Sequence, residues 1–431
     1  MQNLLSPCKY RQNLLSLQSM ELLKKIAFVG IVSLISVACE RTGGEYVPDR
    51  YDDVVILYTV GYNNLSSDIQ ANIRTVRKSA LPMKSVPKAL VLVAHNAAND
   101  EDFNTPTKPV IVQIRSDWVG KSIMDTLKVL DENVTLLEKD VMSGVLSFIC
   151  DRFKSDHYGL IFSSHGTGWL PEDYYRKPRE TLLKSASDAH LPKTKTFGAS
   201  YEGTPAYLKA SHEMTLQDMA GAIPMHPDYI IFDACLMGGI ETAYELRHVT
   251  DRIGFSQAQV LASGFDYSKL SECLLTRRSP EDFCKAFYDY YNAQSGSRRT
   301  ATISLVDCSR LDSLATVCNR FFERYRSGIA SVNPNKVQGF FTTDKHWFYD
   351  LEDIMVKAGI SEHDLAVLSG AIDRCIIYKA HTDRILDSFD VKAFCGFSSY
   401  LPRQGSAFLD EYYKTLAWNR ATGLVGAGIA D

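Results

Sequence analysis

Residues 159–169 read GLIFSSHGTGW, and residues 229–239 read YIIFDACLMGG. Each stretch opens with a short apolar run and then turns polar and glycine-rich, with one reactive side chain, His165 or Cys235, at the change. Short apolar runs of this kind indicate strands that are buried on both faces, as in a parallel sheet covered by helices. The two stretches therefore predict two buried strands that each lead directly into a residue able to do chemistry.

Further strands and helices alternate around these two stretches. Apolar runs at 54–60 and 89–94 predict buried strands, and residues 109–115 predict another strand, antiparallel at an edge of the sheet. Amphipathic segments between the strands predict helices at 66–79, 122–130 and 144–152. This alternation is typical of an α/β fold with a mostly parallel sheet flanked by helices.

The pattern after residue 270 is mostly helical. We expect a core at 51–270 and, at 271–431, a helical and mixed extension of the same unit. Helical spacing occurs at 278–294, 311–327, 351–358 and 363–379, and the apolar segments 300–306 and 394–401 are candidate strands.

His165 and Cys235 are candidates for a catalytic pair. Ligands bind at the carboxyl ends of the strands in open α/β sheets, and adjacent strands would place both side chains across one crevice. A cysteine attacks a carbonyl group as the thiolate, which a nearby histidine or a helix N-terminus favours. The backbone N–H groups of Gly166 and Cys235 are candidate donors to an oxyanion. Alone, each residue has a structural interpretation, a buried cysteine or a strand-end histidine bonded to backbone, and the pairing favours chemistry.

Asp233 precedes Cys235 by two positions in an extended segment, so both side chains are expected on one face. A carboxylate beside the nucleophile suits a basic substrate side chain. The alternative is an aspartate that caps a helix or a turn.

The segments HGTGW and FDACLMGGIETAYELR resemble the two active-site motifs of the clostripain family of cysteine peptidases, relatives of the caspases and gingipains. LYTVGYNNLSSDI, TFGAS, RIGFSQAQVLASGFDY and CGFSSYLP follow the family's order, so the resemblance spans roughly residues 51–402. It implies a caspase-like fold, a dyad without a required third member, and hydrolysis after Arg or Lys. On this resemblance His165 is the acid–base, Cys235 the nucleophile and Asp233 a determinant of basic specificity.

The segment 170–212 loses all periodicity and carries many basic residues. Members of the family are often activated by a cut between the two motifs, where this segment lies. We therefore predict self-cleavage within it, and the alternative is a solvated basic loop. The candidate sites are Arg176, Arg179, Lys184, Lys193 and Lys195.

The first 39 residues have the pattern of a secretory signal peptide. Two lysines precede the apolar run 26–38, which is shorter than the roughly 20 residues that a spanning helix needs. Cys39 follows small residues as in a bacterial lipobox, although Ser36 departs from the usual leucine. Residues 1–19 are a candidate over-long start, and residues 40–50 are a candidate tether. We predict an exported, lipid-anchored protein on the periplasmic or cell surface, with a plain signal peptide as the alternative.

Composition and charge restrict the partners and cofactors that the protein is expected to bind. A formal net charge of −4 without a basic run argues against nucleic acid as a partner, and leaves protein or peptide substrates. Ten cysteines without CxxC pairs argue against a metal site, and no EF-hand-like loop supports calcium, so no cofactor is expected. The rival classes are a non-catalytic anchored scaffold protein of the same fold and a thiol enzyme that acts on another acyl bond.

Overall fold

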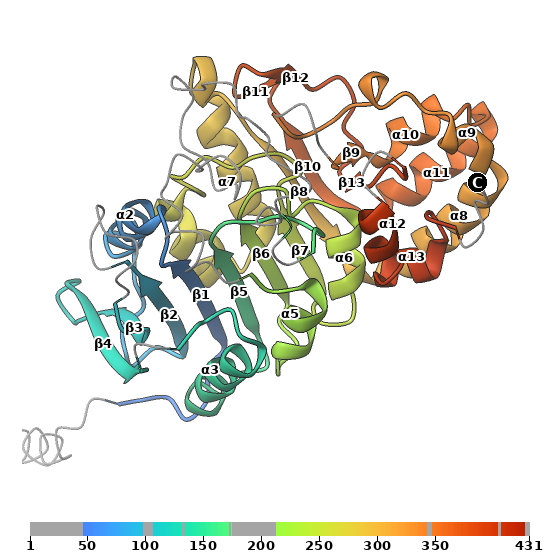
Figure 1. Ribbon diagram of the computed structural model, residues 1–431. Coiled ribbons are helices and arrows are strands. Elements are labelled where there is room, and N and C mark those ends of the chain that lie inside the picture. Colours follow the sequence, from blue (N-terminus) through green and yellow to red (C-terminus); the bar gives the residue numbers. More distant parts are fainter. Residues whose placement is uncertain are drawn as a thin grey trace, which may run out of the picture. The chain divides into compact units, whose positions relative to one another are not determined.

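A nine-stranded sheet forms the centre of the computed structural model, which describes residues 46–97, 107–131, 134–171, 174, 213–342, 347–403 and 407–426. The chain divides into the units Met1–Val47 and Pro48–Asp431, and the sheet belongs to the second (Figure 1). The strand order is β10 (Ile376–His381), β8 (Thr302–Asp307), β7 (Arg252–Phe255), β6 (Tyr229–Asp233), β5 (Tyr158–Ser163), β1 (Asp53–Gly61), β2 (Lys88–Asn96), β3 (Val110–Ser116) and β4 (Ser122–Val129).

The middle of the sheet is parallel, and both of its margins are antiparallel. Strands β2, β1, β5, β6 and β7 run in one direction, while β3 pairs antiparallel with β2 and β8 pairs antiparallel with β7. Every residue of β1, β5 and β6 is buried, which their apolar runs predicted. The expected mostly parallel α/β sheet flanked by helices is confirmed.

Helices cover both faces of the sheet (Figure 1). One face carries α2 (Ser66–Val76), the short 3₁₀-helix η3 (Tyr267–Lys269), the π-helix η4 (Ser271–Thr276), and α7 (Pro280–Asn292). The other face carries α3 (Lys139–Arg152), α5 (Leu216–Ala222) and α6 (Ile240–Leu246).

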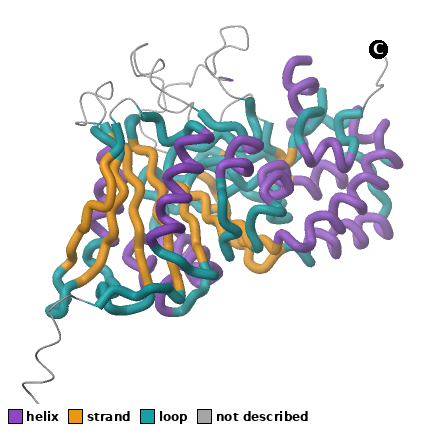
Figure 2. The backbone as a smooth tube through the Cα atoms, turned by 90° about the horizontal axis from the view of Figure 1, so that it is seen from below, coloured by secondary structure: helices purple, strands orange, loops and turns teal. Residues whose placement is uncertain are grey.

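The C-terminal region is largely helical, as predicted, and Figure 2 shows its helices gathered beyond one end of the row of strands. Strands β8 and β10 nevertheless belong to the central sheet, so both sides of residue 270 contribute to it. The remaining elements are α8 (Leu311–Arg324), α9 (Arg326–Ala330), β9 (Tyr349–Asp350), α10 (Leu351–Lys357), α11 (Glu362–Asp373), β11 (Arg384–Ile385), β12 (Phe389–Asp390), β13 (Ser398–Ser399), α12 (Ala407–Tyr413), α13 (Ala417–Thr422), and the short turns η5 (Gly296–Arg298), η6 (Cys308–Arg310) and η7 (Pro334–Lys336).

The helix predicted at 122–130 is wrong, because these residues form the edge strand β4. The spacing of their apolar residues fits a helix, but a tight turn before them directs the chain into a strand. Asp117 accepts the backbone N–H groups of Val119 and Lys121, and Gly120 adopts a φ of +83°. The turn folds β4 back onto β3, so the strand predicted at 109–115 is antiparallel as expected but does not form the edge.

The C-terminal part of the helix predicted at 363–379 is also wrong. Helix α11 ends at Asp373, and Ile376–His381 forms β10, which pairs antiparallel with β8. The β-branched and aromatic residues of this segment fit a strand, and pairing with β8 decides the conformation. Of residues 394–401, only β13 is a strand, whereas residues 300–306 contain β8 as expected.

Candidate active site

The register of two adjacent strands places His165 and Cys235 just beyond neighbouring strand ends. Strands β5 and β6 are parallel neighbours, and Ser163 lies opposite Asp233. His165 and Cys235 each follow two residues later, beyond the carboxyl ends of these strands. The loops that carry them touch, because a Cβ added to Gly166 would lie 2.4 Å from the carbonyl oxygen of Cys235. Only a glycine fits this approach.

The imidazole of His165 is held by the loop that follows β1. Its Nε2 lies 2.8 Å from Oδ1 of Asn64. Asn64 was not singled out from the sequence as a site residue, although it belongs to the GYNN stretch that supported the family resemblance. The amide of Asn64 orients the ring from the side of β1.

The thiol of Cys235 is fully buried and is enclosed by Val260. The backbone N–H of Val260 donates to Sγ at 3.1 Å, and Sγ lies 3.4 Å from the carbonyl oxygen of the same residue. The N–H and the carbonyl group of one residue thus hold the sulfur in place. Leu236, the next residue, has a φ of +61°, which turns the chain sharply after the cysteine. In this conformation the thiol is hydrogen-bonded and has no exposed surface.

Asp233, the last residue of β6, has a completely buried side chain. Its Oδ2 accepts hydrogen bonds from the hydroxyl groups of Ser163, at 2.8 Å, and Tyr267, at 2.7 Å. Burial and the neighbouring carboxylate together raise the pKa of Tyr267 well above its ordinary value. Gly264 packs so closely that an added Cβ would lie 2.5 Å from Oδ2. The carboxylate is thus fixed in place by two hydroxyl groups and a glycine.

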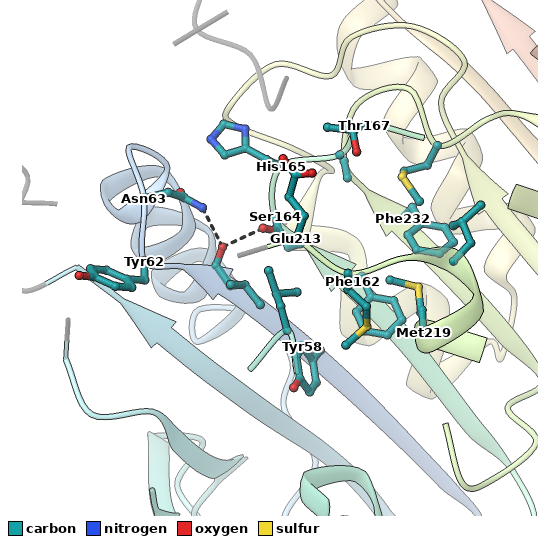
Figure 3. Close-up of a pocket in the computed structure, with 18 of the residues that line it drawn as sticks. Tyr58, Tyr62, Asn63, Phe162, Ser164, His165, Thr167, Glu213, Met219 and Phe232 are labelled. Atoms are coloured by element: carbon teal, nitrogen blue, oxygen red, sulfur yellow. Dashed lines mark hydrogen bonds between the residues drawn. The ribbon is translucent and has the colours of Figure 1, made fainter. Parts of the chain in front are cut away.

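A cavity of about 130 Å³ opens beside His165, and Figure 3 shows several of its lining residues. The aromatic side chains Tyr58, Phe162 and Phe232 line it together with Met219 of α5. Sequence reasoning missed this cavity, because its walls come from several strand ends and from a helix far away in the chain. The remaining lining residues are Val60, Tyr62, Asn63, His95, Thr135, Leu137, Ser163, Ser164, Gly166, Thr167, Gly168, Glu213, Met214, Leu216, Ala234 and Met237.

The described residues contain no cluster of three or more His, Cys, Asp or Glu side chains that could hold a metal ion. Within the same part of the chain, no helix is long and apolar enough to cross a membrane. None of the cysteines described there forms a disulfide. Cys39 and the candidate cleavage residues Arg176, Arg179, Lys184, Lys193 and Lys195 lie outside the described residues.

An α/β sheet that brings a cysteine and a histidine together at its carboxyl edge has the construction of a cysteine peptidase. The model of the clostripain family (Peptidase_C11) matches residues 57–184 and 207–417. The chain therefore belongs to the clostripain family and is a cysteine peptidase. A comparison with curated proteins gave no match.

Solved structures share the fold along almost the whole chain. An inactive zymogen of a C11 protease from Parabacteroides distasonis is 24% identical with a TM-score of 0.70, and the match covers 88% of this chain and 99% of that one. A secreted C11 cysteine protease from Bacteroides thetaiotaomicron, "iotapain", is 21% identical with a TM-score of 0.68, covering 87% and 100%. A C11 protease from the same organism in complex with an irreversible peptide inhibitor is 20% identical with a TM-score of 0.68, covering 86% and 98%.

Proposed function

We propose that the protein is an endopeptidase that cleaves after Arg or Lys, with Cys235 as nucleophile and His165 as acid–base. The observation that carries this proposal is the register of β5 and β6, which sets both residues two positions beyond a paired Ser163 and Asp233. The contact between Gly166 and the Cys235 backbone supports a shared reaction centre.

The reaction follows from these groups. His165 takes the proton of Cys235, and Sγ attacks the carbonyl carbon of the scissile bond. The N–H groups of Gly166 and Cys235 are the proposed donors to the oxyanion. His165 then gives the proton to the leaving amine, which leaves a thioester on Cys235. A water molecule, deprotonated by His165, hydrolyses this thioester and frees the acid product and the thiol.

Asp233 is the proposed determinant of basic specificity. Its carboxylate lies two residues before the nucleophile and is fixed by the hydroxyls of Ser163 and Tyr267. A fixed anion at the base of a pocket favours a guanidinium or ammonium group. In the described conformation the carboxylate is buried, so a rearrangement has to precede substrate binding.

The buried thiol supports a latent form of the enzyme. Cys235 has no exposed surface and is bonded to Val260, so a substrate carbonyl cannot reach it in this conformation. We propose that self-cleavage after Arg176, Arg179, Lys184, Lys193 or Lys195 releases it. N-terminal sequencing should find new termini in the purified wild type and none in Cys235→Ala. An uncut yet active wild type would contradict this proposal.

Quenched fluorescent peptides with Arg, Lys, Asp or Asn before the scissile bond test the activity itself. The nicked enzyme should cleave after Arg or Lys, and cleavage should vanish in Cys235→Ala and in His165→Ala. Cys150→Ala is the matched control, since Cys150 lies on α3, outside both motifs, and forms no disulfide. Asp233→Asn should reduce kcat/KM for basic peptides by about 10–100-fold, because a charge-assisted bond is worth roughly 1.5–3 kcal/mol. No cleavage after nicking would favour the scaffold alternative.

We also propose that the exported protein is a lipoprotein anchored through Cys39. The support is its position directly after the small residues that end the apolar run. Metabolic labelling with a radioactive fatty acid should mark the wild type and a Cys150→Ser control but not Cys39→Ser. Label that persists in Cys39→Ser would refute the anchor.

A further inference from the structure

The cavity beside His165 lies where the strand order reverses. β1 has β2 on one side and β5 on the other, so the chain changes direction across the sheet between β1 and β5. The crevice at such a reversal is where open α/β sheets bind ligands. Tyr58 and Val60 of β1, with Phe162 of β5, line the cavity at this place.

The cavity and Asp233 lie on opposite faces of the sheet. The strand side chains in its wall are mainly at alternate, even-numbered positions, and α5 closes the cavity on that face. Asp233 points to the other face, where Tyr267 of η3 donates to it. His165, at the strand ends, lines the cavity.

The floor of the cavity is apolar, and its rim is polar. Tyr58, Phe162 and Met219 form part of the floor, and Figure 3 shows Glu213, Ser164 and Asn63 near His165. An apolar cavity of about 150 Å³ accommodates a benzene ring, so a cavity of about 130 Å³ has room for one branched or aromatic side chain.

A buried ring nitrogen gives an independent sign that a ligand or water enters here. His95, at the end of β2, lines the cavity, and its side chain is only 4% exposed. Its Nε2 has no hydrogen-bond partner among the described residues. A buried polar atom without a partner costs free energy until a water molecule or a ligand approaches it.

The proposed role of His165 indicates which part of the peptide substrate, before or after the scissile bond, lies next to this cavity. His165 protonates the leaving amine, so the part of the peptide that follows the scissile bond has to pass the imidazole. The part that precedes it carries the basic side chain toward Asp233, on the opposite face of the sheet. We propose that the cavity binds the side chain of the residue after the scissile bond and selects an apolar one. This inference rests on the proposed function.

The apolar floor also disfavours an acidic residue after the scissile bond. Its carboxylate would lose hydration there without gaining an opposite charge among the lining residues of the floor, and the burial of an unpaired charge is costly. The cavity thus favours leucine or phenylalanine and disfavours aspartate at this position.

Quenched peptides with Arg before the scissile bond, and Gly, Leu, Phe or Asp after it, test the proposal on the nicked full chain. One well-bound apolar group changes kcat/KM by about 10–200-fold in a hydrophobic pocket, so Leu should exceed Gly by about tenfold or more, and Asp should rank below Gly. Cleavage of all four peptides at similar rates would overturn the cavity proposal and leave the proposed function intact. Cleavage of none would remove the proposed function and the cavity proposal with it.

Variants of Met219 test whether this cavity causes the preference for an apolar residue after the scissile bond. Met219→Trp fills the space and should lower the Leu-to-Gly ratio of kcat/KM toward one, whereas Met219→Ala enlarges it and should raise the Phe-to-Leu ratio. Gln217→Trp, two residues earlier on α5 and absent from the cavity wall, is the matched control and should keep the wild-type ratios. If Met219→Trp does not fold, Met219→Ala decides, and wild-type ratios in Met219→Ala refute the proposal.

Discussion

At the scale of single residues, the absence of a side chain at Gly166 matters as much as the presence of the thiol. A Cβ at this position would lie 2.4 Å from the carbonyl oxygen of Cys235 and 3.0 Å from Cβ of Ala234. Gly166→Ala must therefore push the histidine loop away from the cysteine loop. Because the Gly166 N–H is a proposed oxyanion donor, we expect kcat to fall by about 10²–10³-fold.

Gly144→Ala is the control for this substitution. Gly144 lies inside α3, and an added Cβ meets no atom within 4 Å. This change should leave kcat unaltered and raise the free energy of unfolding by about 0.5–1 kcal/mol, since glycine is a poor helix former. Measurement of kcat and urea denaturation on both variants separates the two effects. A fully active Gly166→Ala would remove this donor from the mechanism.

At the scale of elements, the sequence located the strands that hold the site. Strands β1, β2, β5 and β6 are buried on both faces, so their apolar runs identify them without knowledge of their neighbours. Strand β4 is half-exposed and β10 follows a helix, so pairing with β3 and β8 decides their conformation. Local pattern does not contain that information.

Within the candidate active site, too, the local sequence pattern predicts some features and not others. The positions of His165 and Cys235 followed from strand ends that each motif marks by itself. The contact between Cys235 and Val260 joins residues 25 positions apart, and the cavity joins β1, β2, β5 and α5. Such contacts depend on tertiary packing, so the burial of the thiol against Val260 was not predictable from the sequence.

Helix α6 follows the loop that carries Cys235, and one buried carboxylate of this helix is hydrogen-bonded to the C-terminal region. Glu241 accepts hydrogen bonds from the hydroxyl groups of Ser399 and Tyr413 and from the backbone N–H of Tyr400. Burial raises its pKa above the ordinary value. Glu241→Ala leaves these buried donors without an acceptor, and each such donor costs about 1–3 kcal/mol.

We therefore expect chemical denaturation to show a loss of several kcal/mol in Glu241→Ala, on the order of the sum over its donors. Glu241→Gln retains an acceptor and should lose less. Glu323→Ala, on the exposed side of α8, should stay within about 0.5 kcal/mol of the wild type. Equal stability of Glu241→Ala and Glu323→Ala would mean that the hydrogen bonds of the Glu241 carboxylate do not stabilise the packing of α6.

At the scale of the whole molecule, one sheet runs through both halves of the chain, since β8 and β10 extend the strands that hold the site. The described part of Pro48–Asp431 should consequently unfold as one cooperative unit. Two buried groups, one in each half, then contribute to a single dependence of stability on pH.

These two contributions have opposite signs. Burial lowers the pKa of His95 to about 4, so between this value and the ordinary 6.5 the unfolded chain binds more protons, and stability rises with pH. Burial raises the pKa of Asp350 to about 6, so between the ordinary 3.8 and this value the folded chain binds more protons, and stability falls with rising pH.

Denaturation of the inactive Cys235→Ala protein between pH 4 and 6.5 measures both contributions. Adding His95→Gln removes the contribution that makes stability rise with pH. The slope of stability against pH should therefore become more negative than in the Cys235→Ala protein. Adding Asp350→Asn removes the contribution that makes stability fall with rising pH, so the slope should become more positive. Each substitution should change the slope by up to about 1.4 kcal/mol per pH unit. Because the slope and not the absolute stability is compared, a general loss of stability in either variant does not obscure the result. Parallel profiles for all three proteins would show that neither group titrates with a perturbed pKa.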